Sequence, residues 1–352
     1  MLKFLYILFY LAQQVNLVYT ISTSGSYRFT GTGTETSNRI VIDNVTSGEV
    51  KIYLNNVNIN TNAGPALKIT STVTAQVCIY LEGQNILKTT QDSSAALQKD
   101  NNSGLTITST NTVTGSLAAQ ASYGAGIGSG YCERSNSASI SGNTVSNITI
   151  SGGSVKATKI DCIPKDSKNN DVYLCKISNA ASSEITIDAV KRNGPYNHSS
   201  IDPSDTTLYA WLTGTDHVVT VGNDSRKYSF DSANYSFTRS KVAPTASQFT
   251  FTPPSNLTYD GQQKSVTVRP KSDIEGMGSN ITVNYFHKDT LINGLPVNAG
   301  TYTVKIGIDE GAFYNSITGL TDNNWKFTIE PAPISTSAIQ ITPYSGTYDG
   351  AP

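Results

Sequence analysis

The stretch VKIYL at Val50–Leu54 returns almost unchanged as VCIYL at Val77–Leu81, 77 − 50 = 27 residues later. In both copies apolar residues alternate with other types, which is the period of a strand that buries one face. The same phase continues at Leu105–Thr108, after 105 − 77 = 28 residues, and at Ile148–Ser151 after a longer gap. A strand that recurs at this spacing predicts a chain that winds, with one such strand in each turn.

A second column of apolar residues closes each predicted turn. Leu67, Leu97 and Ile127 are separated by 97 − 67 = 30 and 127 − 97 = 30 residues, and each follows an Ala or a Gly. A single coil cannot bury its inward side chains, whereas stacked coils bury a continuous apolar column. The sequence therefore predicts an all-β chain in which residues 21–165 form a right-handed parallel β-helix with three short strands per coil.

The glycine-rich run GAGIGSG at Gly124–Gly130 invites comparison with a dinucleotide-binding loop. That loop needs its glycines between a strand and a helix, because the helix N-terminus holds the pyrophosphate. The residues after Gly130 show no helical periodicity. We interpret the run as a tight corner of the β-helix, in which Ile127 takes the inward place that Leu67 and Leu97 take in earlier coils.

A smaller domain is expected after the β-helix. The polar run Lys165–Asp171 has no periodicity and is interpreted as a boundary. Residues 171–240 then alternate as short strands separated by turn residues, which predicts a small antiparallel β-domain. The expected strands are Val172–Leu174, Ile185–Ile187, Tyr209–Leu212 and Val218–Val221, and the block from Trp211 to Val221 resembles the small β-sandwich modules that follow repeat domains in microbial surface proteins.

A tandem repeat occupies the C-terminal part of the chain. Phe251–Pro253 and Tyr259–Gly261 are echoed by Ile341–Pro343 and Tyr348–Gly350, at offsets of 343 − 253 = 90 and 348 − 259 = 89 residues. This length and its alternating strands predict an Ig-like β-sandwich over residues 244–331, with a second, truncated copy beginning at 332–352. The motifs at Tyr259–Gly261, Asn298–Val304 and Asn324–Ile329 resemble the YDG-type Ig-like repeats of bacterial surface adhesins.

Composition and the N-terminal segment bear on location and partners. Of the 352 residues only 14% are charged and the formal net charge is −1, which argues against nucleic acid as a partner. Lys3 followed by the apolar run Phe4–Ala12 predicts a signal peptide over residues 1–20. The alternative, a membrane anchor, needs about 20 apolar residues. We therefore expect a secreted or cell-surface protein with no membrane span in this sequence.

Secretion would place the four cysteines in an oxidising compartment. Cys162 and Cys175 are close enough in sequence to close a loop by a disulfide, and a bridge between Cys78 and Cys132 remains an alternative. Metal ligation by these residues is not expected, because no C-x-x-C pair occurs and the three histidines are scattered.

The sequence contains no recognisable enzyme motif. His217 has no paired nucleophile or carboxylate in a recognisable motif, and is interpreted as a turn or strand-edge residue. Asp161, Asp166 and Asp171 could bind calcium with backbone oxygens, although a solvated linker is the preferred interpretation and no other cofactor is expected. The acidic residues of the predicted coils are placed in corners or loops, and no two recur at coil spacing: Glu49, Glu82, Asp92, Asp100 and Glu133.

Two tyrosines are the candidate ligand-binding residues. Since Val50, Ile52 and Leu54 point inward, Tyr53 points outward, and the coil phase places Tyr80 directly above it. Stacked exposed tyrosines can hold sugar rings. The alternative is a ladder that stabilises the exterior of the helix without any ligand.

The stretch from Ile40 to Lys156 resembles the β-helical carbohydrate-binding domains of secreted anaerobe and protist surface proteins. The motifs that carry this resemblance are Gly64–Leu67, Gly124–Gly128 and Ile148–Val155. It implies a non-catalytic surface protein for adhesion or carbohydrate binding, whose partner is a glycan or the surface of a host or neighbouring cell. The alternatives are a polysaccharide-degrading β-helix enzyme and a structural stalk with no ligand.

Overall fold

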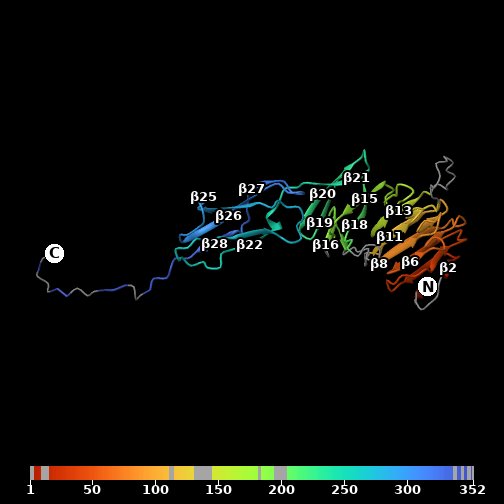
Figure 1. Ribbon diagram of the computed structural model, residues 1–352, viewed down its shortest axis with the longest axis horizontal. Coiled ribbons are helices and arrows are strands. Elements are labelled where there is room, and N and C mark those ends of the chain that lie inside the picture. Colours follow the sequence, from red (N-terminus) through yellow and green to blue (C-terminus); the bar gives the residue numbers. More distant parts are fainter. Residues whose placement is uncertain are drawn as a thin grey trace. The chain divides into compact units, whose positions relative to one another are not determined.

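The computed structural model describes residues 4–8, 16–110, 115–130, 145–180, 184–193, 204–335, 339–341, 345–346 and 350 (Figure 1). The chain divides into two compact units, Met1–Ser240 and Lys241–Pro352. The described elements are strands, apart from one short 3-10 turn at Ala246–Gln248, so the predicted all-β class is confirmed. Within these residues no helix is long and apolar enough to cross a membrane.

The first unit begins with a parallel β-helix of about four turns, as predicted. Val50 pairs with Val77, Val77 with Leu105 and Leu105 with Ile148, so the phase predicted from the sequence is confirmed. The strands of this sheet, in spatial order, are β1 (Phe4–Leu8), β3 (Gly25–Thr30), β5 (Glu49–Asn55), β8 (Gln76–Thr89), β10 (Leu105–Ser109) and β13 (Ile148–Ile150).

Two further parallel faces complete each coil. Leu67 pairs with Leu97 and Leu97 with Ile127, which confirms the second predicted column. That face consists of β2 (Val18–Ile21), β4 (Arg39–Ile42), β7 (Leu67–Ile69), β9 (Leu97–Lys99) and β12 (Ile127–Gly128). The third face consists of β6 (Asn58–Thr61), the second half of β8, β11 (Gly115–Ala121) and β14 (Ser154–Ala157).

The inward side chains form one apolar column along the helix. Ile52, Ile79 and Ile107 are fully buried in successive coils of β5, β8 and β10. Neighbouring strands lie about 4.8 Å apart, so side chains of the same phase are in van der Waals contact and exclude water. This burial provides the stability that one coil alone would lack.

The corner at Gly124–Gly130 is confirmed as a structural element of the helix. A Cβ on Gly124 would lie 2.3 Å from the Ser94 carbonyl oxygen, and one on Gly126 would lie 2.5 Å from that of Ala119. Ile127 is fully buried beneath this corner. These glycines are therefore required by the close approach of two backbones.

An earlier coil escaped the sequence analysis. Strand β3 stacks on β5, with Tyr27 opposite Ile52 and Phe29 opposite Leu54. Strand β1, which lies inside the predicted signal peptide, pairs in parallel with β3. Removal of residues 1–20 as a signal peptide stays a prediction.

The described strands in the remainder of the first unit pair antiparallel. One sheet pairs β15 (Val172–Ile177) with β18 (Leu208–Thr213). The other has the order β17 (Val190–Asn193), β16 (Glu184–Ile187), β19 (His217–Val221), β20 (Asp224–Asp231) and β21 (Ser236–Ser240). Residues of both sheets share one core, which includes Cys175, Leu208 and Val219.

Strand β18 packs directly on the third face of the β-helix. The Trp211 indole Nε1 donates to the Val155 carbonyl at 3.0 Å, and the Tyr209 amide donates to Ser154 Oγ at 3.0 Å. The run Lys165–Asp171, expected to be a domain boundary, lies inside this one compact unit, because the Ile150 amide donates to the Lys165 carbonyl at 2.8 Å. The antiparallel domain therefore covers the last coil of the helix.

The second unit contains two antiparallel sheets around one core. Trp325 lies in that core with Phe249 and Phe327, and the Tyr302 hydroxyl donates to the Asn298 carbonyl at 2.8 Å. One sheet pairs β22 (Phe249–Thr252) with β23 (Thr267–Pro270); the other contains β24 (Ile281–His287), β25 (Thr290–Leu291), β26 (Gly300–Ile308), β27 (Ile317–Leu320) and β28 (Lys326–Ile329). The described residues between 331 and 350 form no strand.

Replacing Ile52 by Ala should destabilise the helix strongly. Ile52 is fully buried between two coils, so the truncation removes apolar contacts and leaves a cavity that costs about 2–5 kcal/mol. The free energy of unfolding in urea measures this loss. The neighbouring outward Lys51→Ala is the control and should cost less than about 0.5 kcal/mol; equal losses would contradict the assigned inward face.

The buried Lys99 should make stability depend on alkaline pH. Burial lowers the pKa of this ammonium to about 8, although it donates to the carbonyls of Asn101 and Ser146 at 2.6 and 3.1 Å. The unfolded chain then binds more protons than the folded one between about pH 8 and 10.5, so stability rises with pH in that window. The rise is at most about 3 kcal/mol, from 1.36 kcal/mol per pKa unit.

A comparison of the native protein with Lys99→Met by thermal unfolding isolates this contribution. The native protein should gain stability relative to the variant as the pH rises from 8 to 10. A difference that is constant or falls over this range would show that Lys99 keeps an ordinary pKa.

Candidate functional site

The outward face of the sheet β3-β5-β8-β10 carries rows of side chains that repeat from coil to coil. One row runs Arg28, Tyr53, Tyr80 and Thr108 on successive strands. The next row along the strands contains Lys51, Cys78 and Thr106. We call this surface, from Arg28 to Thr108, the tyrosine face.

The two tyrosines lie as the sequence predicts. The rings of Tyr53 and Tyr80 stack with centroids 4.8 Å apart and planes inclined by 13°. The Arg28 guanidinium carbon lies 5.0 Å from the centroid of the Tyr53 ring. Tyr53 therefore has both ring faces engaged, one by Tyr80 and the other by Arg28 through a cation–π contact.

Tyr80 differs from Tyr53 in what meets its second face. The residue that pairs with it on the next coil is Thr108, whose side chain is too short to cover a phenol ring. Partial burial and the nearby Cys78 raise the pKa of the Tyr80 phenol, so its hydroxyl stays protonated at neutral pH and can donate a hydrogen bond. The stack thus ends in an aromatic surface bordered by a hydroxyl.

Arg28 is held in place by an ion pair across three coils. Its guanidinium makes two contacts with the Glu82 carboxylate, one of them 3.0 Å between Nη2 and Oε1, and Glu82 is largely buried. A two-point contact fixes the guanidinium plane above Tyr53. Sequence reasoning missed Arg28, although its spacing of 53 − 28 = 25 residues from Tyr53 is close to the coil length.

A second carboxylate borders the tyrosine face. Glu49 accepts a hydrogen bond from the Cys78 thiol at 3.1 Å and pairs with Lys51 at 3.1 Å. Burial raises the pKa of Cys78 to about 11, which keeps this thiol protonated and unreactive at neutral pH. Glu49 and Glu82 lie within strands β5 and β8, so their predicted placement in corners or loops is wrong.

The predicted disulfide between Cys162 and Cys175 is wrong. Both thiols are free; Cys162 packs against the core of the β-helix, whereas Cys175 lies in the core of the antiparallel domain. Closeness in sequence did not bring them together because the chain turns away between the two cores. The alternative bridge involves Cys132, which lies outside the described residues.

The three aspartates considered for calcium do not form one site. Asp161 accepts from the Ser129 amide at 2.6 Å, Asp171 pairs with Lys165, and Asp166 accepts from the Lys168 and Asn170 amides, each at 2.8 Å. Among the described residues no group of three or more His, Cys, Asp or Glu side chains could hold a metal ion. Each carboxylate instead closes its own turn or ion pair.

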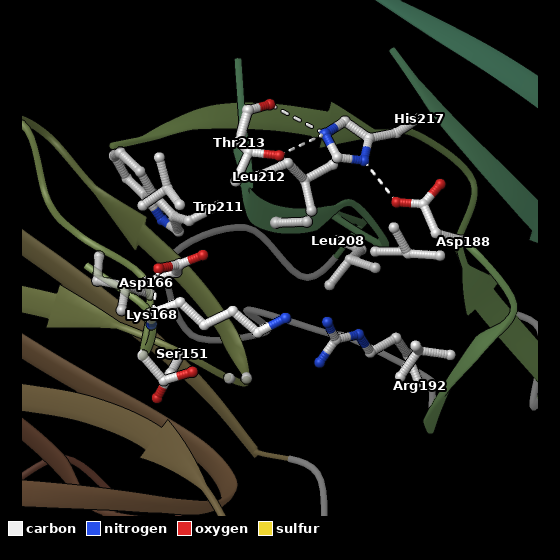
Figure 2. A pocket seen from close by; sticks show the side chains of 18 residues that line it. Ser151, Asp166, Lys168, Asp188, Arg192, Leu208, Trp211, Leu212, Thr213 and His217 are labelled. Carbon is white, nitrogen blue, oxygen red and sulfur yellow. Dashed lines mark hydrogen bonds and ion pairs between the residues drawn. The ribbon is translucent and has the colours of Figure 1, made fainter. Parts of the chain in front are cut away.

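A cavity of about 330 Å³ lies between the last coil of the β-helix and the antiparallel domain (Figure 2). Its walls include Ser151 from the end of β13, Lys168 from the turn before β15, Arg192 from β17 and Trp211 from β18. Sequence reasoning did not foresee this cavity, since its residues come from several separate segments between residues 150 and 217. His217 is the residue of this wall that the sequence analysis had singled out.

His217 is almost fully buried and both of its ring nitrogens are engaged. Its Nδ1 lies 2.6 Å from a carboxylate oxygen of Asp188, and its Nε2 lies 2.9 Å from the Thr213 carbonyl oxygen. Both ring nitrogens therefore have partners within the protein, and neither is directed at a ligand in the cavity. Burial acts to raise the pKa of Asp188. The hydrogen bonds from His217 and from the Val218 amide outweigh this effect and hold the pKa below its ordinary value. The interpretation of His217 as a strand-edge structural residue agrees with this geometry.

Comparison with protein families gives a match over the first part of the chain. A family model described as "Carbohydrate-binding domain-containing protein" matches residues 16–131, which include strands β2 to β12 and the whole tyrosine face. No curated protein and no solved structure matches the chain. The matched residues end before the cavity at His217.

Replacing His217 by Ala should destabilise the antiparallel domain. The change removes the His217 donors from the Asp188 carboxylate and the Thr213 carbonyl, which keep the Val218 and Thr215 amides. Asp188 is half exposed, so we expect a cost of about 1 kcal/mol from the lost hydrogen bonds. Denaturant unfolding measures the loss. His287→Ala is the matched control, since His287 makes a single bond from Nδ1 to the Thr301 carbonyl at 3.1 Å, and its loss should be smaller; the reverse order would contradict the structural role of His217.

Proposed function

We propose that the protein binds carbohydrate on the tyrosine face, without catalysing a reaction on it. The observation that carries the proposal is the stack of Tyr53 and Tyr80, which presents one phenol face beside Thr108. The family match over residues 16–131 supports a carbohydrate ligand for this part of the chain.

The chemistry of the tyrosine face suits a sugar ring. The C–H face of a pyranose stacks on an aromatic ring, and its hydroxyls need donors and acceptors at the ring edge. Tyr80 offers the ring, while Thr106 and Thr108 place hydroxyls on the next strand. Gln76, whose amide lies 3.2 Å from the Thr106 hydroxyl, adds a further donor.

The state of the carboxylates supports a binding role. Hydrolysis of a glycosidic bond commonly uses two carboxyl groups that face the scissile bond. Here Glu82 is paired with Arg28, and Glu49 is engaged by Lys51 and Cys78. A polysaccharide-degrading enzyme is the rival function, and release of reducing ends or unsaturated sugars from polysaccharides incubated with the protein would establish it.

We further propose that the β-helix is displayed at the cell surface, as an adhesin, on a stalk of Ig-like repeats. Two features of the second unit support this: its two antiparallel sheets share a core, and the Tyr302 hydroxyl bonds back to Asn298, as the corner tyrosine of Ig-like domains does. Secretion is supported by the apolar run Phe4–Ala12 after Lys3. N-terminal sequencing of the protein exported by a secreting host tests the proposed signal peptide. Exported protein that still begins at Met1 would contradict its removal.

Removal of the open Tyr80 ring should weaken binding to glycans. Tyr80→Ala should weaken retention by about tenfold or more, because stacking of a ring on one aromatic contributes about 1.4 kcal/mol or more. Tyr53→Ala should weaken it less, since both of its ring faces are already covered within the protein. Affinity electrophoresis against glycans that are positive on an array measures the two effects.

The control for this experiment is Tyr123→Ala. Tyr123 is an exposed tyrosine within the matched residues, but it follows β11 on another face of the helix. It should leave retention unchanged, and all three variants should keep the far-UV spectrum of the native protein. An array that stays blank, or retention that survives Tyr80→Ala, would favour the ladder without a ligand.

A further inference from the structure

Two cationic side chains face one another in the cavity beside His217. Figure 2 shows the Lys168 ammonium and the Arg192 guanidinium pointing toward each other from opposite walls. In the part of the chain that the structure describes, neither group has an ion pair or a side-chain hydrogen bond. Like charges repel one another, and an anion placed between them would reverse the sign of that interaction.

The backbone on each wall is held firmly. Lys168 lies in a turn that Asp166 closes by accepting from the Lys168 and Asn170 amides and from the Asn170 side chain at 2.8, 2.8 and 2.9 Å. Arg192 lies on β17, next to a turn in which Asp188 and Ala189 adopt φ of 48° and 63°. The bond from His217 to Asp188 ties this turn to β19. The backbone positions from which the two cations project are therefore fixed, so binding has to order only the two side chains.

The two acids of the same wall attract the cations: the Lys168 ammonium contributes to the lowered pKa of Asp166, and the Arg192 guanidinium to that of Asp188. Both carboxylates are nevertheless occupied by other donors. Asp166 uses its oxygens on three N–H donors of its own turn, and Asp188 accepts from His217 and from the Val218 amide at 3.0 Å. Figure 2 shows the Asp188 carboxylate directed toward His217, away from Lys168. The space between Lys168 and Arg192 is thus bordered by donors.

We infer that this cavity binds a small organic anion through its carboxylate. A guanidinium matches the two oxygens of a carboxylate, and the ammonium adds a third donor. The cavity volume of about 330 Å³ fits a ligand of monosaccharide size, and Leu208, Leu212 and Trp211 offer apolar surface for its body. The inference does not rest on the proposed function, because every residue of the cavity lies outside the tyrosine face and outside residues 16–131.

Titration calorimetry on the full chain with three probes tests the inference. Glucuronate carries the carboxylate on a monosaccharide, glucose has the same size without the charge, and inorganic phosphate has the charge without the organic body. Glucuronate should bind, and glucose and phosphate should bind at least about tenfold more weakly. Equal binding of glucose would overturn the role of the charge, and equal or tighter binding of phosphate would overturn the organic ligand.

Variants assign the binding to the two cations. Arg192→Gln and Lys168→Gln should each weaken glucuronate by about tenfold or more, the usual effect of losing one charge-assisted hydrogen bond. Lys191→Gln is the matched control, because Lys191 is an exposed neighbour on β17 that pairs with Glu184 and does not line the cavity. Its effect should stay within about twofold.

Two outcomes separate this site from the tyrosine face. Tyr80→Ala should leave glucuronate binding unchanged, whereas loss of binding in that variant would place the anion on the tyrosine face and overturn the inference. Lys168 lies on an exposed turn, so Lys168→Gln is expected to fold even if Arg192→Gln does not. Binding that is unaffected in a folded Lys168→Gln protein would also overturn it.

Discussion

Parallel pairing between successive coils is the constraint on which the tyrosine face and the cavity both depend. The Val77 amide donates to the Gly104 carbonyl and the Leu105 amide to the Asn147 carbonyl, each at 3.0 Å, so each coil is fixed against the next. Side chains of one phase then lie above one another along the helix. A shift of the strands by one residue would turn Tyr53 and Tyr80 toward the core and the apolar residues outward. The burial of the apolar columns therefore also decides which side chains lie on the outward face.

The part of the site that follows from this repeat could be predicted from the sequence. Alternation within a strand decides which side chains point outward, and the 27-residue offset decides which of them meet, so the stack of Tyr53 on Tyr80 needed no further information. Arg28 was missed because its strand, GSYRFT, has the half-buried Tyr27 and the buried Phe29 where later coils bury aliphatic residues. The alternation within this strand is too weak to identify a coil from the sequence alone. Once the register of β3 on β5 is known, the place of Arg28 beside Tyr53 is evident.

The cavity depends on packing between the β-helix and the antiparallel domain, and it could not be predicted from a repeat in the sequence. Lys168 and Arg192 are brought together by the way the antiparallel domain covers the last coil, through Trp211 and Tyr209 on β18. No periodicity links residues 168 and 192. The same packing explains the wrong disulfide, since Cys162 and Cys175 belong to separate cores. The open end of a β-helix exposes unpaired strand edges, and covering them stabilises the fold while leaving a cavity where the two surfaces do not match.

The whole account depends on the register between β5 and β8, and a cross-linking measurement tests this register most directly. Lys51 and Cys78 pair on the outward face, so Lys51→Cys places a second thiol opposite the native one. Oxidation followed by peptide mass spectrometry should find these two positions joined, whereas Tyr53→Cys, which faces Tyr80, should not link to Cys78. A cross-link in Tyr53→Cys but not in Lys51→Cys would show a different register and would contradict the tyrosine stack.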